Sequence, residues 1–490
     1  MGLQIIVSLF AVLGFGLILW LTDVVGQARK ATRTTLSAIS GMMDSELDDD
    51  AKEIAARRAG IGLIISAIQV FWRFALALAV AAVPIYAADA VGLAPRDDVL
   101  SLMLRFDYII IVSVIAIGVV EGGRRLSGVD SAGKQAAPGN ATLNHYSPAD
   151  RFFHGLAFSS PAVLKGASWF EDRLLGQSEP ETRPIFITSL ARGGTTALLN
   201  ALHDVPSVAT HTYRDMPFVT APILWNRMSG GEKRAVTRHQ RAHGDGLEID
   251  LDSPEAFEEV LWKLGWPEKY KADRILLWDS GDRQPAAERF MALHMGKIKR
   301  ARQGKVGPDI RYVSKNNANI GRIPYLIEAF PDARIVVPVR RPEAHAASLM
   351  RQHQNFLKLQ GEDPFVRRYM RDIGHFEFGQ ILKPMDFPGF EIGRFDPQQP
   401  DFWIDYWLHA FRHVWEHRAA CRFVLQDDLR ATAQTTVSAL LADLGLAADA
   451  MSFEGHFRSG PDTSDAGLYS RALHEEAMAL YNDFVGACRR

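Results

Sequence analysis

Apolar residues are concentrated in the first quarter of the chain, in three stretches that are each long enough to form a membrane-spanning helix. The first stretch, residues 3–22, has no charged side chain, and the other two cover residues 61–88 and 100–120. A helix of about 20 apolar residues crosses a hydrocarbon core of about 30 Å. The pattern therefore predicts a transmembrane span within residues 1–25 and a transmembrane hairpin over residues 60–125.

Charged residues within these stretches leave the number of spans open. Arg73 interrupts the second stretch, and Arg105 and Asp107 lie near the start of the third. An arginine at the centre of a bilayer costs roughly 2.5–3.5 kcal/mol on insertion scales, so we expect Arg73 near an interface or against a neighbouring helix. In the alternative arrangement, residues 61–72 lie on the membrane surface and only residues 74–93 insert. We expect about three spans, with two as the alternative.

Lysine and arginine residues predict the orientation of the chain. They cluster after the first and third stretches, whereas the loop between the second and third holds only Arg96, with Arg105 at its edge. Cytoplasmic segments carry an excess of these residues. The N-terminus is therefore expected outside, residues 26–59 form a polar cytoplasmic linker, and the large C-terminal part lies in the cytoplasm at an inner or plasma membrane. The clustered residues are Arg29, Lys30, Arg33, Lys52, Arg57, Arg58, Arg124, Arg125 and Lys134.

The pattern changes after the apolar region. Residues 126–183 are expected to form a linker of small and polar residues, followed by an amphipathic helix over residues 151–176. From Pro184 onward, short β-rich runs alternate with helical patterns, which predicts an α/β fold with a parallel sheet flanked by helices over residues 184–490. Ligands in such folds bind beyond the carboxyl ends of the strands. The four expected strands lie in PIFITSL, IRYVSK, ARIVVPV and CRFVLQ.

A glycine-rich turn joins the first expected strand to the first expected helix, in the segment ITSLARGGTTALL. Backbone N–H groups at a helix N-terminus and the positive end of the helix dipole attract an anion. Ser189 stands where a Walker A loop has its first glycine, and Thr195 stands where that loop has its lysine, so this is not a Walker A loop. The candidate phosphate-binding residues are Arg192, Gly193, Gly194, Thr195 and Thr196.

Composition excludes several other classes of protein. The chain has 55 basic and 57 acidic residues, a net charge of −2, which argues against a dedicated nucleic-acid-binding protein. Cys421 and Cys488 are the only cysteines. Two cysteines exclude a disulfide framework and any multi-cysteine zinc or iron–sulfur site.

Two segments of the sequence resemble the cofactor-binding motifs of the sulfotransferases that use 3′-phosphoadenylyl sulfate (PAPS). The glycine-rich turn is similar to their 5′-phosphosulfate loop, usually P-[RK]-S-G-T-T, with Ala191 in place of the proline and Gly193 in place of the serine. The second segment is a strand followed by Arg340, Pro342 and Ser348. In the family, this arginine and serine bind the 3′-phosphate of PAPS. The resemblance covers roughly residues 184–465.

The resemblance implies a membrane-anchored enzyme that transfers a sulfuryl group from PAPS, its co-substrate, to a hydroxyl or amine. Because of the expected anchor, we expect a membrane-associated acceptor such as a lipid or a lipid-linked glycan. The alternatives are an inactive membrane scaffold that keeps the fold, and a kinase-like phosphotransferase, which the missing Walker lysine disfavours. The acceptor, the position sulfated and the oligomeric state stay open. No nucleic-acid partner is expected.

Sulfuryl transfer poses three catalytic tasks if it resembles phosphoryl transfer: neutralising the leaving phosphate, holding the equatorial oxygens and accepting a proton. Arg192 suits the first task, and Lys315, at the end of an expected strand, suits the second. Many soluble relatives carry K-T-H in that region and use the histidine as the base. This chain has Lys315, Asn316 and Asn317 there. Asparagine does not accept a proton at neutral pH, so the base must lie elsewhere.

A carboxylate after the phosphate loop is the first alternative for the base. Other branches of the family use a carboxylate some 20–30 residues after that loop, and Asp215 lies 23 residues after Arg192. We therefore expect Asp215 to be the base, with His211 as the runner-up. In the competing interpretation, Asp215 pairs with Arg214 or Arg227 and only shapes a loop.

Other titratable residues are weaker candidates. Glu258 and Glu259 follow an expected helix start and are expected to face solvent. His409, His413 and His417 recur every four residues, so one helix face could present them to a metal ion. Because sulfuryl transfer needs no metal, and no neighbouring carboxylate pattern supports a site, no metal is expected.

Overall fold

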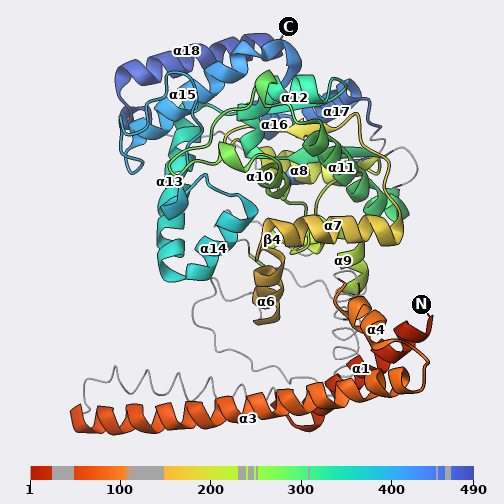
Figure 1. The fold of residues 1–490 in the computed structure, drawn as a ribbon. Coiled ribbons are helices and arrows are strands. Elements are labelled where there is room, and N and C mark those ends of the chain that lie inside the picture. The colour runs from red at the N-terminus through yellow and green to blue at the C-terminus, as the bar shows by residue number, and fades with distance from the viewer. Residues whose placement is uncertain are drawn as a thin grey trace. The chain divides into compact units, whose positions relative to one another are not determined.

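The structure, a computed structural model, describes residues 2–24, 49–105, 108, 112, 148–229, 239–240, 248–249, 252–306, 310–447, 451–457 and 465–489. The chain divides into two compact units, Met1–Gln135 and Ala136–Arg490 (Figure 1). The first unit contains the apolar helices, and the second contains a parallel β-sheet with its covering helices.

The first unit contains three described helices: α1 (Gly2–Leu21), α3 (Asp49–Ala90) and α4 (Arg96–Met103). Among the described residues, two segments are long and apolar enough to cross a membrane, Gly2–Leu19 and Ile68–Ala90. The described part of the chain therefore holds two candidate spans, which correspond to the first and second of the three expected stretches. The third predicted stretch begins within the short, charged helix α4 and otherwise lies almost entirely outside the described residues.

Arg73, the charged residue within the second apolar stretch, lies against the end of α1. Its Nε donates a hydrogen bond to the carbonyl oxygen of Thr22 at 2.9 Å, and its Nη1 donates to the carbonyl oxygen of Gln69 at 3.1 Å. Beside this contact, the rings of Phe15 and Phe74 meet edge to face at 6.0 Å. Arg73 therefore satisfies a carbonyl group at a helix end that has no partner within the helix.

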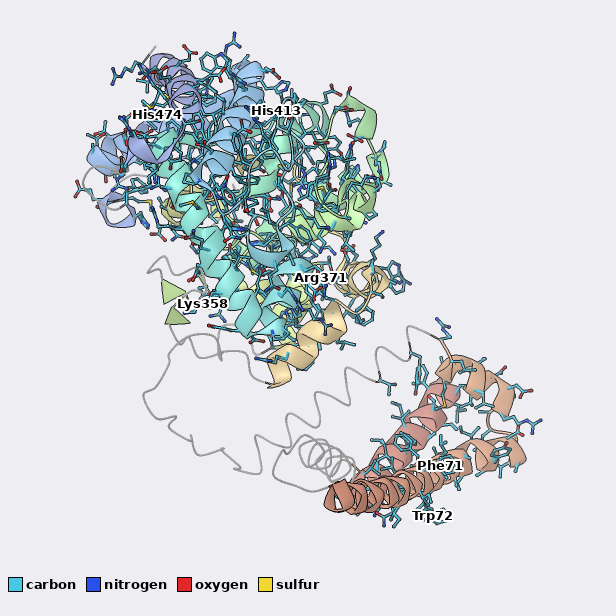
Figure 2. The ribbon with its side chains drawn as sticks, turned by 90° about the vertical axis from the view of Figure 1, so that its left-hand side faces the viewer. Phe71, Trp72, Lys358, Arg371, His413 and His474 are labelled. Carbon is cyan, nitrogen blue, oxygen red and sulfur yellow. The ribbon has the colours of Figure 1, made fainter. Side chains whose placement is uncertain are left out.

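The outward faces of α1 and α3 are apolar. Phe71 and Trp72 are 76% and 64% exposed and project away from the helix pair (Figure 2). On α1, Phe10 and Leu13 are 63% and 67% exposed. Contiguous exposed apolar surface of this kind marks a protein or membrane contact rather than an ordinary water-facing surface.

The second unit is built on a five-stranded sheet with the strand order β2-β5-β1-β6-β7, in which all neighbouring strands are parallel. All four predicted strands are present, and β2 adds a short edge, so the predicted α/β fold is confirmed. A separate antiparallel pair joins β3 to β4. The strands are β1 (Ile185–Ile187), β2 (Val208–Ala209), β3 (His239–Gln240), β4 (Glu248–Ile249), β5 (Arg311–Lys315), β6 (Arg334–Val339) and β7 (Cys421–Leu425).

Helices follow most strands and cover the sheet. The amphipathic segment expected over residues 151–176 forms two helices, because Pro161 begins a new one. Two long helices, α15 and α18, lie side by side (Figure 1). The helices of this unit are α6 (Pro148–Ala157), α7 (Pro161–Leu175), α8 (Thr195–His203), α9 (Pro222–Met228), α10 (Glu259–Gly265), α11 (Pro285–Val306), α12 (Ile323–Ala329), α13 (Pro342–Glu362), α14 (Pro364–Ile373), α15 (Pro400–Glu416), α16 (Gln426–Ala431), α17 (Ala433–Leu444) and α18 (Arg471–Cys488).

Strand β1 is buried on both faces. Ile185 and Ile187 pack into a core with α8 and α17, whereas Phe186 points to the opposite core, which α11, α13 and α15 contribute to. This alternation follows from the two-residue period of a strand. Parallel strands covered on both faces consist of nearly continuous apolar residues, as here. Because β5, β1 and β6 are adjacent and parallel, their carboxyl ends lie side by side.

Candidate functional site

The glycine-rich turn after β1 has an unusual backbone conformation. Arg192 and Gly194 have φ angles of +68° and +92°, and α8 begins directly afterwards at Thr195. Positive φ is uncommon for a residue other than glycine. At Gly193, an added Cβ would lie 2.6 Å from Ser189 Oγ, so the turn tolerates no side chain there without rearrangement. The loop therefore presents its backbone at the N-terminus of α8, as an anion site requires.

The two segments expected to bind the cofactor meet at this turn. Arg340 directly follows β6, and its Nη1 donates a hydrogen bond to the carbonyl oxygen of Arg192 at 2.9 Å. The Nε of Arg192 donates to the Oγ of Ser348 at 3.3 Å, on the second turn of α13. Arg192, Arg340 and Ser348 therefore lie together, although more than 140 residues separate the first from the other two in sequence.

A buried histidine, to which no sequence motif pointed, binds the backbone of the turn. His345 of α13 contacts the carbonyl oxygen of Ala191 through Nε2 at 2.8 Å. Trp407 donates its indole N–H to His345 Nδ1 at 3.2 Å. An indole N–H can only donate, so Nδ1 must accept and Nε2 must carry the proton. The imidazole is therefore held as one neutral tautomer that binds the loop backbone.

Lys315 and Asn317 lie at the end of β5, next to the turn. Lys315 is buried and pairs in register with Ile187 of β1. Asn317 follows two residues later, and two threonines bind it: Thr195 donates to its Oδ1 at 3.2 Å, and Thr188 donates to its carbonyl oxygen at 3.3 Å. Asn317 thus occupies the space immediately beside the first residue of α8.

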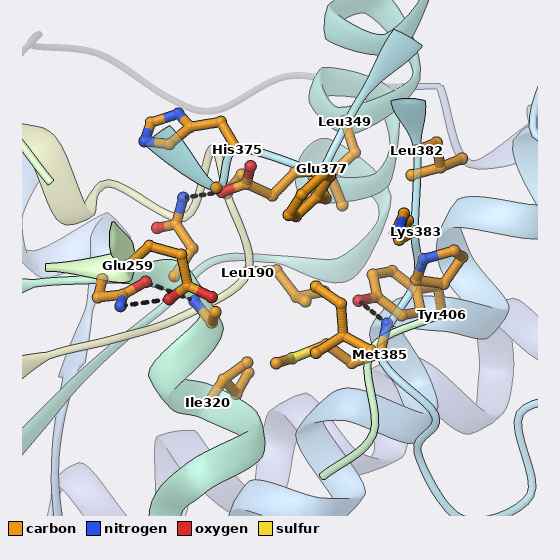
Figure 3. A pocket seen from close by; sticks show the side chains of 18 of the residues that line it. Leu190, Glu259, Ile320, Leu349, His375, Glu377, Leu382, Lys383, Met385 and Tyr406 are labelled. Atoms are coloured by element: carbon orange, nitrogen blue, oxygen red, sulfur yellow. Dashed lines mark hydrogen bonds between the residues drawn. The ribbon is translucent and has the colours of Figure 1, made fainter. Parts of the chain in front are cut away.

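A pocket that is partly open to solvent adjoins this end of β5 (Figure 3). Its wall is mainly apolar. Five titratable side chains also line it, and they come from α10, from the loop that follows α14 and from α15. The apolar wall includes Leu190, Ile320, Leu349, Phe376, Leu382, Met385 and Trp403, and the titratable residues are Glu259, His375, Glu377, Lys383 and Tyr406.

Comparison with known proteins decides the class of this domain. The family model described as "Sulfotransferase family" matches residues 184–377. These residues form a sulfotransferase family domain. The predicted enzyme class is therefore confirmed for this part of the chain.

No curated protein matches the chain. Similar solved structures include the sulfotransferase STF9 from Mycobacterium avium, with 12% identity and a TM-score of 0.41 over 71% of this chain and 87% of that one. They also include STF1 from Mycobacterium tuberculosis H37Rv, with 16% identity and a TM-score of 0.34 over 71% and 87%. A third is the sulfotransferase from Alicyclobacillus acidocaldarius, with 14% identity and a TM-score of 0.30 over 62% and 94%.

Asp215 of the sulfotransferase domain is fully buried and lies outside the pocket. Arg302 donates to both of its carboxylate oxygens, at 2.9 and 3.0 Å, and the backbone N–H of Thr212 donates at 3.0 Å. Burial would raise the pKa of Asp215, but the positive charge of Arg302 and the hydrogen bond from His211 outweigh burial and hold it well below the usual range. This environment argues against Asp215 as the base.

The competing interpretation of Asp215 is correct in kind but names the wrong partner. The carboxylate pairs with Arg302 of α11, whereas Arg214 pairs with Asp252. His211, the runner-up base, is also buried: its Nδ1 contacts Asp215 at 3.2 Å, and its Nε2 contacts His294 Nε2 at 3.0 Å. Both ring nitrogens of His211 contact other side chains, and His211 does not line the pocket.

Glu258 and Glu259 are buried, so the expectation that they face solvent is wrong. Glu258 accepts hydrogen bonds from Trp262 Nε1 at 3.0 Å and from the Tyr312 hydroxyl at 3.0 Å. Glu259 pairs with both terminal nitrogens of Arg322, at 2.8 and 2.7 Å. Burial raises the pKa of Glu259, but Arg322 more than compensates and lowers it overall. Both carboxylates therefore serve the core of the sulfotransferase domain.

The histidines of α15 are only partly grouped as expected. His409 contacts the carbonyl oxygen of Pro388 through Nδ1 at 2.9 Å. His413, Glu416 and His417 lie within 4.8 Å of one another, a spacing at which the described residues could hold a metal ion. Burial lowers the pKa of His413 to about 4. This group lies at the C-terminal end of α15, whereas the pocket is lined by the N-terminal half of that helix.

Proposed function

We propose that this protein transfers the sulfuryl group of PAPS to a hydroxyl group held in the pocket beside the glycine-rich turn. The observation that carries the proposal is the meeting of Arg192, Arg340 and Ser348 at the carboxyl edge of the sheet, within a sulfotransferase family domain. Two phosphate-binding segments at one edge suit a donor that carries two separate phosphate groups. PAPS is such a donor, with a phosphosulfate at the 5′ position and a phosphate at the 3′ position.

In this proposal the turn binds the phosphosulfate end of the donor. The backbone N–H groups of Gly194–Thr196 and the guanidinium of Arg192 face the 5′-phosphate, which becomes the leaving group. Arg340 and Ser348 bind the 3′-phosphate. Lys315 stabilises the negative charge that develops in transfer. Because such a transition state is loose, fixed charges and positioning supply most of the catalysis.

Lys315→Ala should lower kcat about 10²–10³-fold, since it removes one electrostatic group that acts on the transition state. Binding of adenosine 3′,5′-bisphosphate should change much less, because that product lacks the sulfuryl group. Turnover of radiolabelled PAPS measures the first effect and thermal stabilisation by the bisphosphate measures the second. Lys358→Ala is the matched control, because Lys358 is 75% exposed on α13 (Figure 2). Equal turnover in both variants would contradict the assignment.

The pocket and the N-terminal helices together suggest the kind of acceptor. The pocket wall is mainly apolar, so a hydroxyl carried on an apolar body fits it. The two apolar helices of the first unit would keep the protein at a membrane, where such molecules concentrate. We therefore propose a lipid-type acceptor. Incubating the protein with radiolabelled PAPS and a membrane lipid extract, followed by mass spectrometry of the labelled product, would identify it.

The membrane assignment makes a separate prediction. The full chain should stay in the membrane pellet after alkaline carbonate extraction, because the two candidate spans expose apolar side chains to lipid. A chain that starts near Ser147 should be released. Protease added outside intact cells should not reach the C-terminal part. Release of the full chain by carbonate would refute integral insertion, and external cleavage would refute the cytoplasmic orientation.

A further inference from the structure

Transfer to a hydroxyl group leaves a proton that some residue must accept. The histidine that many soluble relatives use corresponds to Asn317 in this chain, and Asp215 is locked to Arg302 outside the pocket. The remaining candidates for the base are the titratable side chains that line the pocket itself: Glu259, His375, Glu377, Lys383 and Tyr406.

We propose that Glu377 is the catalytic base and that Asn317 is the residue that positions it. This inference rests on the proposed function and adds the proton acceptor to the same site. The side-chain amide of Asn317 donates from Nδ2 to Glu377 Oε1 at 3.1 Å (Figure 3). The carboxylate thus lies against the side chain that replaces the histidine of the relatives.

Asn317 also connects Glu377 to the donor side of the site. Its Oδ1 accepts from the hydroxyl of Thr195, the first residue of α8, at 3.2 Å. The orientation of the amide follows from these partners, because only the NH₂ end can donate to a carboxylate. One amide group therefore separates the base from the turn that holds the phosphosulfate. A hydroxyl in the pocket beside Glu377 would face that turn.

The loop that carries Glu377 is tightly packed at both of its ends. Gly374 and Gly379 bracket it with φ angles of +85° and +75°. An added Cβ at these positions would lie 2.5 Å from Glu259 and 2.4 Å from Gln360, so the loop packs tightly at both ends. Phe376 and Phe378 are both 5% exposed on either side of Glu377. Because the neighbours are buried, the carboxylate between them is held toward the pocket.

The other four candidates are engaged elsewhere. The Tyr406 hydroxyl accepts from the backbone N–H of Met385 at 3.1 Å, and burial raises its pKa, so it stays protonated. Glu259 binds Arg322 through both oxygens and also accepts from Asn316 and from Tyr270. The ring of His375 points away from Glu377 and the pocket centre, and it contacts the carbonyl oxygen of Ala256 at 3.4 Å (Figure 3). The ammonium group of Lys383 donates to a backbone carbonyl oxygen at 2.6 Å, and a charged ammonium has no lone pair with which to accept a proton.

The step that follows is balanced in atoms and charge. The acceptor oxygen forms a bond to sulfur while the bond from sulfur to the bridging oxygen of the 5′-phosphosulfate breaks. The electron pair of the broken bond stays on that oxygen, which leaves as part of adenosine 3′,5′-bisphosphate. The hydroxyl proton moves to the carboxylate of Glu377, which returns it to solvent after the product leaves.

The test uses Glu377→Gln in the full chain with radiolabelled PAPS and two probe acceptors, octanol and para-nitrophenol. Octanol keeps its proton at neutral pH, whereas para-nitrophenol loses much of its own. A missing base should therefore lower kcat for octanol about 10²-fold or more and should lower it much less for para-nitrophenol. Thermal stabilisation by adenosine 3′,5′-bisphosphate should stay normal. Glu362→Gln is the matched control, because Glu362 is half exposed at the end of α13.

A second substitution adds a gain of function. Asn317→His in the Glu377→Gln background places an imidazole where the soluble relatives have one. We expect turnover of octanol to recover in part, with a pH–rate profile that rises through the histidine range near about 6.5.

Three results would overturn the assignment. They are normal octanol turnover in Glu377→Gln, an equal loss with both acceptors, and wild-type protein that binds the bisphosphate but transfers to neither acceptor. The proposed function fails separately, if the bisphosphate does not stabilise the wild-type protein at all.

Discussion

Arg340→Ala should remove most of the thermal stabilisation that we expect adenosine 3′,5′-bisphosphate to confer on the wild-type protein. A ligand that binds only the folded state stabilises it, by about 2.7 kcal/mol at 100 times its Kd. Arg340 follows β6 and lies against the turn that is proposed to hold the 5′-phosphate, so its guanidinium is placed for the second phosphate. Charge-assisted bonds from arginine to phosphate are among the strong ones. Loss of this arginine should therefore weaken binding far more than loss of an ordinary surface charge.

The neighbouring arginine supplies the control for this experiment. Arg341 is 40% exposed and pairs with Glu343. Arg341→Ala should keep nearly the full ligand-induced shift in Tm, measured by differential scanning fluorimetry in detergent. Adenosine 5′-phosphate, which lacks the 3′-phosphate, should give a small shift with the wild-type protein. Equal shifts from the two nucleotides, or equal losses in both variants, would contradict the assignment of the 3′-phosphate site.

Asp215→Asn should destabilise the second unit by about 3–5 kcal/mol, because it leaves Arg302 largely buried without its counter-charge. The measurement is chemical or thermal unfolding of the purified protein. Asp443→Asn is the matched control, because Asp443 and its partner Arg422 are 40% and 58% exposed. Exposed pairs contribute about 0–1 kcal/mol. If Asp215→Asn kept normal stability but lost turnover, Asp215 would be the base after all.

Asp215 should also contribute to the sensitivity of the folded protein to acid. The pKa of Asp215 is held below its usual range in the folded state, with burial outweighed by Arg302 and His211. Its contribution to stability is therefore complete above the unfolded pKa of about 3.9, and it is lost as the pH falls below that value. Asp215→Asn cannot titrate. The stability difference between wild type and variant should consequently shrink as the pH drops from about 5 toward 3.

Features that depend on local pattern could be predicted from the sequence. The four longer strands and the glycine-rich turn follow from apolar runs, β-branched residues and glycine placement within a few residues. The sequence also indicated that both cofactor-binding segments follow strands of one parallel sheet, and the carboxyl ends of parallel strands lie together. Arg192 contacts both Arg340 and Ser348 there.

Features that depend on contacts between distant segments could not be predicted. Asp215 looked available for catalysis because its partner, Arg302, lies 87 residues further along the chain on another helix. Glu258 and Glu259 looked solvent-exposed because acidic residues at a helix start usually are, whereas here tyrosine and arginine partners from distant elements compensate their burial. Glu377 carries no motif of its own, although two glycines flank the short run that contains it.

The atoms around Gly193 restrict which side chain the turn can carry at that position. An added Cβ at Gly193 would lie 3.1 Å from the ring of His345, and two hydrogen bonds fix that ring. The same Cβ would lie closer still to Ser189 Oγ, at 2.6 Å, and to the carbonyl oxygen of Leu190, at 3.0 Å. The serine usual at this loop position therefore requires the Ser189 side chain to move and the ring of His345 to yield slightly. Directed evolution that introduces Gly193→Ser should recover second-site changes at Ser189 first and at His345 second.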